Sequence, residues 1–232
     1  MDLTPDARVF WEAGFVRINA TIVFTVVVDL VILFVAWLAT RRITSELTIS
    51  RWQNLLEVVV SAIRDQLAEI SGGAEPVRYL PFVGTLFLFI AVSNALVIVP
   101  FYDPPTASLS TTTALALCVF IAVPAYGIAE RGLAAYLRRY IEPSPLMLPF
   151  NIIGDLSRTA ALSIRLFGNI MSGSLIVVLI LALAPFFFPV LINVLGLLTG
   201  LIQAYIFAVL AAVFIASGAQ AQTPSPPQEN SR

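Results

Sequence analysis

Residues 146–183 form a predominantly apolar run, and Arg165 lies near its middle. An apolar helix of about 20 residues already crosses the hydrocarbon core of a bilayer, which is about 30 Å thick. The guanidinium group keeps its charge at any working pH, and a charge at this depth costs roughly 2.5–3.5 kcal/mol on insertion scales. We therefore expect Arg165 to face a partner, a cavity or a ligand, and to be functional.

Four further segments are long and apolar enough to span a membrane: 18–39, 79–100, 112–129 and 190–219. The chain is 59% hydrophobic and only 12% charged, which excludes an ordinary soluble domain. The spans 146–183 and 190–219 are longer than a perpendicular crossing requires, so we expect two tilted helices joined as a hairpin. The predicted fold is an all-α polytopic membrane protein with five transmembrane helices.

Residues 51–71 predict one more helix, which is amphipathic. Its apolar side chains recur at intervals of three and four residues: Trp52, Leu55, Val59, Ile63, Leu67 and Ile70. Such a helix lies on the membrane surface or against the other helices. We expect a single transmembrane domain over 18–219, preceded by an N-terminal segment, 1–17, and followed by a disordered polar tail, 220–232.

The arginines predict the orientation of the chain. Most of them lie between spans one and two or between spans three and four: Arg41, Arg42, Arg51, Arg64, Arg78, Arg131, Arg138 and Arg139. The opposite side has only Arg8 and Arg17. Because basic loops remain in the cytoplasm, we expect the N-terminus outside and the C-terminus inside.

Several residue types are missing or rare. The sequence has no His and a single cysteine, Cys118, so it predicts no metal site and no cofactor. All 13 basic residues are Arg, which excludes a phosphate-binding loop that needs Lys. The net charge of −1 gives no general attraction to nucleic acid. Any proton relay must use carboxylates, hydroxyls or water.

Polar residues gather around Arg165 on one side of the fourth span. At about 100° per residue, a narrow sector holds Arg158, Leu162, Arg165, Asn169 and Ser172. Asp155 precedes Arg158 by one helical turn, so these two residues can form an ion pair. Arg165 has no acid one turn away, and its counter-charge must come from elsewhere or from another subunit.

The fifth span has a face of small and polar residues: Asn193, Gly196, Thr199, Gly200 and Gln203. Small residues allow close approach of another helix, and Gln203 can form a hydrogen bond across it. For Gly196, Thr199 and Gly200, ordinary helix packing is the leading interpretation. For Gln203, a functional role beside Arg165 is favoured.

Two polar residues in the earlier spans have open roles. Asp29 lies in an apolar part of the first span, where a carboxylate must be paired or neutral. Helix packing and an ion path are both compatible with its position. Asn94, near the end of the second span, is expected to form a packing hydrogen bond.

The segments SIRLFGNIMSG and GLIQAYIFAVLAAVFI resemble the a subunit of the Fo membrane sector of bacterial F-type ATP synthases. RWQNLLEVVVSAI resembles the surface helix of that family, and LPFVGTLFLFIAVSNALVIVP resembles its next span. The resemblance implies a stator in the bacterial inner membrane, beside a ring of c subunits and the b subunits of a peripheral stalk. Ions would reach the ring through one half-channel and leave through another. Arg165 would separate the two, with Asn169 and Gln203 at the same interface.

The chain also departs from the family pattern. Many members have Glu where this chain has Ser174 and His where it has Gly196, while Thr159 and Asn151 replace a Pro and an acid. The remaining half-channel candidates are Ser174, Asn193, Asn94, Asp29, Asp155 and Arg158. These departures suit the N-type side branch of the family, which is often linked to sodium, so the ion could be H⁺ or Na⁺.

Two other classes of protein fit the sequence less well. A free-standing secondary transporter could use Arg165 to bind an anionic substrate, but such proteins commonly contain internal repeats, and this sequence shows none. A purely structural membrane protein would leave the alignment of Arg165 with Asn169 unexplained.

Overall fold

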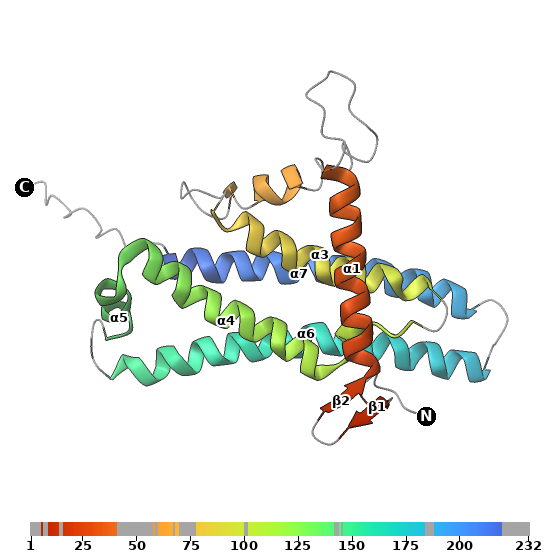
Figure 1. The fold of residues 1–232 in the computed structure, drawn as a ribbon. Helices are drawn as coiled ribbons and strands as arrows, with labels where there is room; N and C mark the ends of the chain where they lie inside the picture. The colour runs from red at the N-terminus through yellow and green to blue at the C-terminus, as the bar shows by residue number, and fades with distance from the viewer. Residues whose placement is uncertain are drawn as a thin grey trace, which may run out of the picture.

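The computed structural model describes residues 6, 9–13, 16–40, 58, 60–66, 68–69, 78–99, 102–141, 144, 146–183 and 188–219. Its α-helices are α1 (Ala20–Thr40), α3 (Leu80–Ala95), α4 (Leu109–Arg131), α5 (Leu133–Ile141), α6 (Met147–Leu183) and α7 (Phe188–Ala219). Two short 3₁₀ helices, η3 (Leu96–Ile98) and η4 (Pro105–Ala107), lie between α3 and α4. Strands β1 (Val9–Ala13) and β2 (Val16–Asn19) precede α1 (Figure 1).

Five of these helices are long and apolar enough to cross a membrane, which confirms the all-α polytopic fold. Their bounds differ most from the predicted spans at α3, where the α-helix ends at Ala95 and η3 follows, and at α4, which begins three residues earlier than expected. The reason is a helix cap: the Ser108 side chain accepts a hydrogen bond of 3.2 Å from the backbone nitrogen of Ser110.

Helices α6 and α7 form the predicted pair of long antiparallel helices. They contain 37 and 32 residues, which at 1.5 Å per residue gives lengths of about 55 and 48 Å. The 21 residues of α1 give only about 31 Å, close to the thickness of the hydrocarbon core. Figure 1 shows α1 crossing the other long helices steeply. With α1 along the membrane normal, α6 and α7 are therefore strongly tilted.

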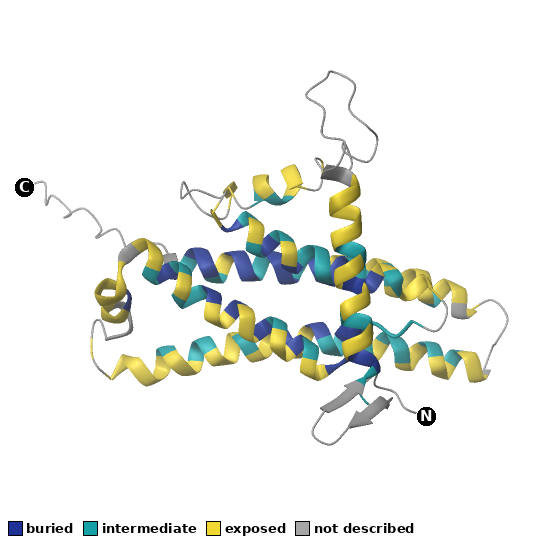
Figure 2. Ribbon diagram, in the orientation of Figure 1, coloured by how far each residue is buried: buried dark blue, intermediate teal, exposed yellow. Residues whose placement is uncertain are grey.

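Helix α7 lies at the centre of the packed core. Its Ala204, Phe207 and Ala211 are fully buried and pack with Ile90 of α3 and Leu166 of α6. Small side chains allow this close packing in a bilayer, where lipid tails are as apolar as the side chains themselves. Figure 2 shows buried residues along α7 and mainly exposed residues along α1. The many exposed apolar side chains provide a surface for membrane lipid, as predicted.

The N-terminal hairpin was not expected from the sequence. Strands β1 and β2 pair antiparallel, with Ala13 opposite Val16. Just before the hairpin, the Asp6 carboxylate accepts hydrogen bonds from the hydroxyls of Thr21 (2.6 Å) and Ser108 (2.5 Å). Asp6 therefore ties the N-terminal segment to the starts of both α1 and α4.

The predicted surface helix is described only in part. Residues 60–66 are helical, and within them Ile63 packs against a cluster formed by α3, α4 and α7. The Tyr205 hydroxyl of α7 donates a hydrogen bond of 2.7 Å to the side-chain oxygen of Gln66. This part of the helix therefore lies against the other helices. Residues 58, 68 and 69 are also helical, while the other residues of 51–71 and the tail at 220–232 lie outside the described residues.

Helix α5 was also not predicted. Gly132 ends α4 with φ +81°, a conformation that favours glycine, and its backbone nitrogen donates to the Ile128 carbonyl at 2.8 Å. The chain turns there and continues as α5, so that Tyr136 is buried against α4 next to Gly127. Arg138, expected only as a membrane anchor, lies on this short helix.

Candidate ion path

Arg165 is exposed on α6, although Leu162 and Leu166 beside it are buried. Leu162 and Leu166 are 2% and 0% exposed and belong to the core shared with α3, α4 and α7. Within the part of the chain that the structure describes, the guanidinium group has no ion pair or hydrogen bond. This geometry agrees with the sequence, which provides no acid one turn away.

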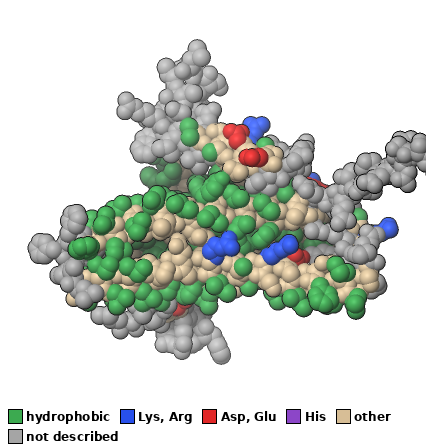
Figure 3. Space-filling model, turned by 180° about the vertical axis from the view of Figure 1, so that it is seen from behind, with side chains coloured by type: hydrophobic (Ala, Val, Ile, Leu, Met, Phe, Trp, Pro, Cys, Tyr) green, Lys and Arg blue, Asp and Glu red, His purple; other side chains and the backbone are tan. Residues whose placement is uncertain are grey.

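A hydroxyl cluster holds α6 against α4 next to Arg165. The Ser163 hydroxyl lies 3.0 Å from that of Thr113 and donates to that of Thr112 at 3.3 Å. Ser163 is 4% exposed. Ser163 lies about 160° around the helix from Arg165, and Arg165 itself is exposed, so the guanidinium group lies outside the buried face of α6. Figure 3 shows the side of the molecule opposite to Figure 1, where basic side chains interrupt a mainly apolar and uncharged surface.

A cavity of about 260 Å³, which we call the Asn94 cavity, lies between α3, α6, α7 and the loop before α4. It brings together three of the predicted half-channel residues, one from each of three helices, and Asn169 also lines it. The polar side chains that line it are Asn94, Tyr102, Asp103, Asn169, Ser174 and Asn193. Gly196 and Thr199 of the small, polar face of α7 also line it.

Asn94 is held in place by hydrogen bonds on both sides of its amide. Its nitrogen donates to the Gly200 carbonyl at 3.0 Å, and its oxygen accepts from the Thr106 hydroxyl at 3.3 Å. Thr106 is in turn 3.3 Å from the Ser93 hydroxyl. The predicted packing hydrogen bond of Asn94 is therefore present, and Asn94 also lines a cavity.

Tyr102 was missed by the sequence reasoning. Its hydroxyl is buried and has no hydrogen-bond partner of normal geometry within the described residues. Burial raises the pKa of Tyr102 to about 12, while the nearby Ser93 hydroxyl opposes this rise. Buried hydroxyls are nearly always hydrogen-bonded, so the Asn94 cavity suits water or a hydrated cation. No sequence signal separates Tyr102 from an ordinary loop tyrosine.

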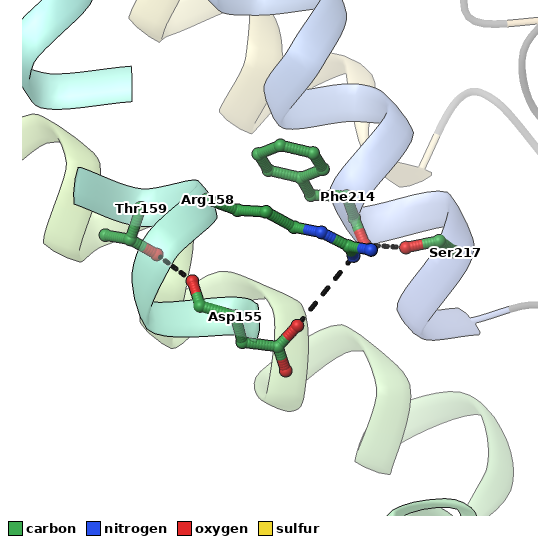
Figure 4. Close-up of polar contacts among 5 residues, drawn as sticks. All are labelled: Asp155, Arg158, Thr159, Phe214 and Ser217. Carbon is green, nitrogen blue, oxygen red and sulfur yellow. Dashed lines mark hydrogen bonds and ion pairs between the residues drawn. The ribbon is translucent and has the colours of Figure 1, made fainter. Parts of the chain in front are cut away.

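A second cavity of about 480 Å³, the Arg158 cavity, lies between α4, α5, α6 and α7. Its polar lining includes Asp155, Arg158, Thr159 and Ser217. Arg158 lies 3.8 Å from the Asp155 carboxylate, which confirms that the predicted ion pair can form. Figure 4 shows Arg158 reaching from α6 towards α7, where its guanidinium carbon is 5.8 Å from the centre of the Phe214 ring.

The two cavities lie on opposite sides of the level of Arg165. Along α6, Thr159 lines the Arg158 cavity and Asn169 lines the Asn94 cavity. These residues are about 15 Å apart along the helix axis, and Arg165 lies between them. On α7, Thr199 lines the Asn94 cavity and Phe214 lines the Arg158 cavity. Gln203 lies between these two residues and is 7% exposed.

Asn169 connects α6 with α7 beside the Asn94 cavity. Its amide nitrogen donates a long hydrogen bond of 3.4 Å to the Thr199 carbonyl. The structure thus brings Asn169, Ser174, Asn193 and Asn94 together. It places Asp29 elsewhere, in an open groove between α1 and α3.

Two cavities with polar groups in their walls lie on either side of an intramembrane arginine that has no partner among the described residues, an arrangement typical of polytopic membrane proteins that conduct ions. The family described as ATP synthase A chain matches residues 22–216. ATP synthase subunit a 2 of Acaryochloris marina is 59% identical over 95% of this chain and 94% of its own length. ATP synthase subunit a 1 of Chlorobaculum parvum is 55% identical over 97% of this chain and 99% of its own length. ATP synthase subunit a of Albidiferax ferrireducens is 53% identical over 97% of each chain. The chain belongs to the ATP synthase A chain family.

Membership of this family confirms the resemblance found in the motifs around Arg165 and Gln203. The chain is a multi-pass membrane subunit that transports ions within the Fo sector of an ATP synthase, and it is not catalytic alone.

Proposed function

We propose that this chain is the stator subunit that guides H⁺ or Na⁺ to and from a rotating ring of c subunits. The observation that carries the proposal is the position of Arg165, exposed on α6 between the Asn94 and Arg158 cavities. Its exposed face is where the ring would stand. The b subunits of a peripheral stalk would hold the chain against rotation.

The two cavities would act as half-channels. With the N-terminus outside, as the arginine distribution predicts, the Asn94 cavity opens towards the outside and the Arg158 cavity towards the cytoplasm. An ion from outside would pass Asn169 and neutralise a ring carboxylate. After nearly a full turn of the ring, the ion would leave through the Arg158 cavity.

Arg165 would prevent the two half-channels from joining. A permanent positive charge attracts an ionised ring carboxylate and so favours release of its ion. The same charge repels any cation that moves directly from one cavity to the other. The lack of a counter-ion for Arg165 among the described residues supports this role, because an internal carboxylate would neutralise the charge.

A free-standing secondary transporter is not favoured. Its anionic substrate would have to bind Arg165 inside a pocket, yet Arg165 lines neither of the two polar cavities. Relatives that are more than half identical and cover nearly the whole chain are ATP synthase subunits.

The decisive experiment compares Arg165→Ala with Arg64→Ala in the reconstituted whole complex. Arg64 is exposed on the surface helix, away from both cavities. We expect Arg165→Ala to abolish ATP-driven pumping and ion-driven ATP synthesis while the complex stays intact on native gels. Arg64→Ala should remain coupled. Full coupling in Arg165→Ala would refute the proposal.

The coupling ion needs a separate experiment. Near the Asn94 cavity the hydrogen-bonding groups are mainly neutral amides and hydroxyls, which can serve water-borne protons or a hydrated cation. The complex would be reconstituted in sodium-depleted liposomes, and pumping followed as sodium is restored. Proton uptake without sodium would identify a proton path. Sodium-dependent hydrolysis with sodium uptake would place the chain in the sodium-coupled branch.

A further inference from the structure

Asp29 is a carboxylate that the proposed ion path does not use. It lies near the middle of α1 and is exposed, and it has no hydrogen bond or ion pair within the described parts of the chain. An ionisable side chain at this depth of a membrane normally pairs with another polar group or faces water. Asp29 therefore requires a polar partner that the described residues do not provide.

The surroundings of Asp29 form a groove of about 430 Å³ between α1 and α3. Besides Asp29, the groove is lined by Ile32, Leu33, Thr85, Leu86 and Phe89, so most of its wall is apolar. Figure 1 shows α1 crossing α3 steeply. Two helices that cross in this way separate on either side of the crossing point and leave room for a third helix.

Thr85 has the one hydroxyl among the residues that line the groove, and it does not donate a hydrogen bond to the Asp29 carboxylate. Thr85 donates its proton to the Phe82 carbonyl of its own helix at 2.8 Å. The described residues that line the groove therefore supply no hydrogen-bond donor for the carboxylate, and a neighbouring subunit can supply one.

Three occupants of the groove can be compared. Lipid tails fit its apolar wall but carry no donor for Asp29. A metal ion would need more oxygen ligands than one carboxylate and one hydroxyl. A transmembrane helix with one polar side chain can pack against the apolar wall and donate a hydrogen bond to the Asp29 carboxylate.

We propose that the groove between α1 and α3 binds a transmembrane helix of another subunit of the complex, and that this helix donates a hydrogen bond from Arg, Lys, Asn or Gln to Asp29. The proposal requires only that the chain works within a multi-subunit membrane complex. It stands whether or not Arg165 separates two half-channels.

Site-specific photo-crosslinking in the intact complex tests the proposal without changing Asp29. A benzophenone amino acid is placed at Leu33, which lines the groove and is 65% exposed. The matched control is Leu30, which is 59% exposed on the same helix but does not line the groove. Mass spectrometry identifies the crosslinked chain and segment.

We expect Leu33 to crosslink to a transmembrane segment of another subunit several-fold more than Leu30 does. That segment should carry Arg, Lys, Asn or Gln at the depth of Asp29. Crosslinks to lipid alone or to this chain alone would overturn the proposal, as would a crosslinked segment without such a residue.

Substitutions at Asp29 provide the second measurement. Asp29→Leu removes the acceptor and should lower the amount of the crosslinked subunit that copurifies with the complex. Asp29→Asn keeps an acceptor oxygen, so more of the crosslinked subunit should copurify with this variant than with Asp29→Leu. Unchanged subunit composition in Asp29→Leu would show that the carboxylate has no such partner.

Discussion

The side-chain amide of Asn94 on α3 donates its hydrogen bond to the backbone carbonyl of Gly200 on α7, at 3.0 Å. A Cβ atom at position 200 would lie only 3.0 Å from both the Cβ and the Cγ of Asn94. The absence of a side chain at Gly200 therefore permits the contact that joins α3 and α7 beside the Asn94 cavity.

We expect Gly200→Ala to destabilise the protein, because the added methyl group would push α3 away from α7. Overpacking of this kind costs about 1–3 kcal/mol. The control is Gly154→Ala on α6, where an added Cβ would meet no atom within 4 Å. Thermal unfolding of the purified complex should show a lower midpoint for Gly200→Ala only. Equal midpoints for the two variants would contradict the packing argument.

Arg165→Lys should abolish coupled transport although it preserves a basic residue. Lysine can lose its proton in a low-dielectric site, whereas arginine cannot. Arg158→Lys is the comparison, since Arg158 has Asp155 at 3.8 Å to keep a lysine charged. ATP-driven pumping should be lost in the first variant and largely kept in the second. Normal pumping in Arg165→Lys would mean that a permanent charge is not required.

Substitutions of Ser174 test whether ion transport depends on the open volume of the Asn94 cavity or on the hydroxyl group in its wall. The Ser174 hydroxyl already donates to the Met171 carbonyl at 2.9 Å, so Ser174→Ala should transport ions at nearly the normal rate. Ser174→Leu should slow transport strongly, because its larger side chain would fill part of a cavity of about 260 Å³. Transport rates in proteoliposomes provide the measurement. If Ser174→Leu transports normally, the ion does not pass through this cavity.

We expect the folded protein to lose stability at high pH because of Tyr102. It lies outside the spans, and burial raises its pKa from 10.0 to about 12. The folded state therefore holds this proton more tightly than the unfolded state does. Tyr102 has no effect on the pH dependence of stability below about pH 10 and lowers stability between pH 10 and 12. Unfolding midpoints of the wild type and Tyr102→Phe, measured from pH 8 to 12, should show a shallower decline for the variant.

The helices could be predicted closely because each long apolar segment must become one helix in a bilayer. The predicted span 146–183 matches α6 to within one residue at its start, and 190–219 differs from α7 by two residues. The strands β1 and β2 and the short helix α5 were missed. They lie outside the spans, where the bilayer imposes no such requirement and local turns decide the structure.

The candidate site could be predicted only where a residue is unusual on its own helix. Arg165 and the pair of Asp155 and Arg158 stand out by depth and spacing, so periodicity was enough to find them. The role of Tyr102 depends on which loop folds over which cavity. The separation of Asp29 from Asn94 likewise depends on the steep crossing of α1 over α3, which no pattern in one helix reveals.

The buried contacts of Leu162, Ser163 and Leu166 have a consequence for the motor as a whole. Together with the hydrogen bonds from Ser163 to α4, they restrict rotation of α6 about its own axis and so fix the direction in which Arg165 points. In the proposed function, a ring of c subunits would turn past this face and exert a sideways force on it. The hydroxyls of Ser163, Thr112 and Thr113 line neither cavity. Their contacts between α6 and α4 would keep the side chain of Arg165 directed towards that ring.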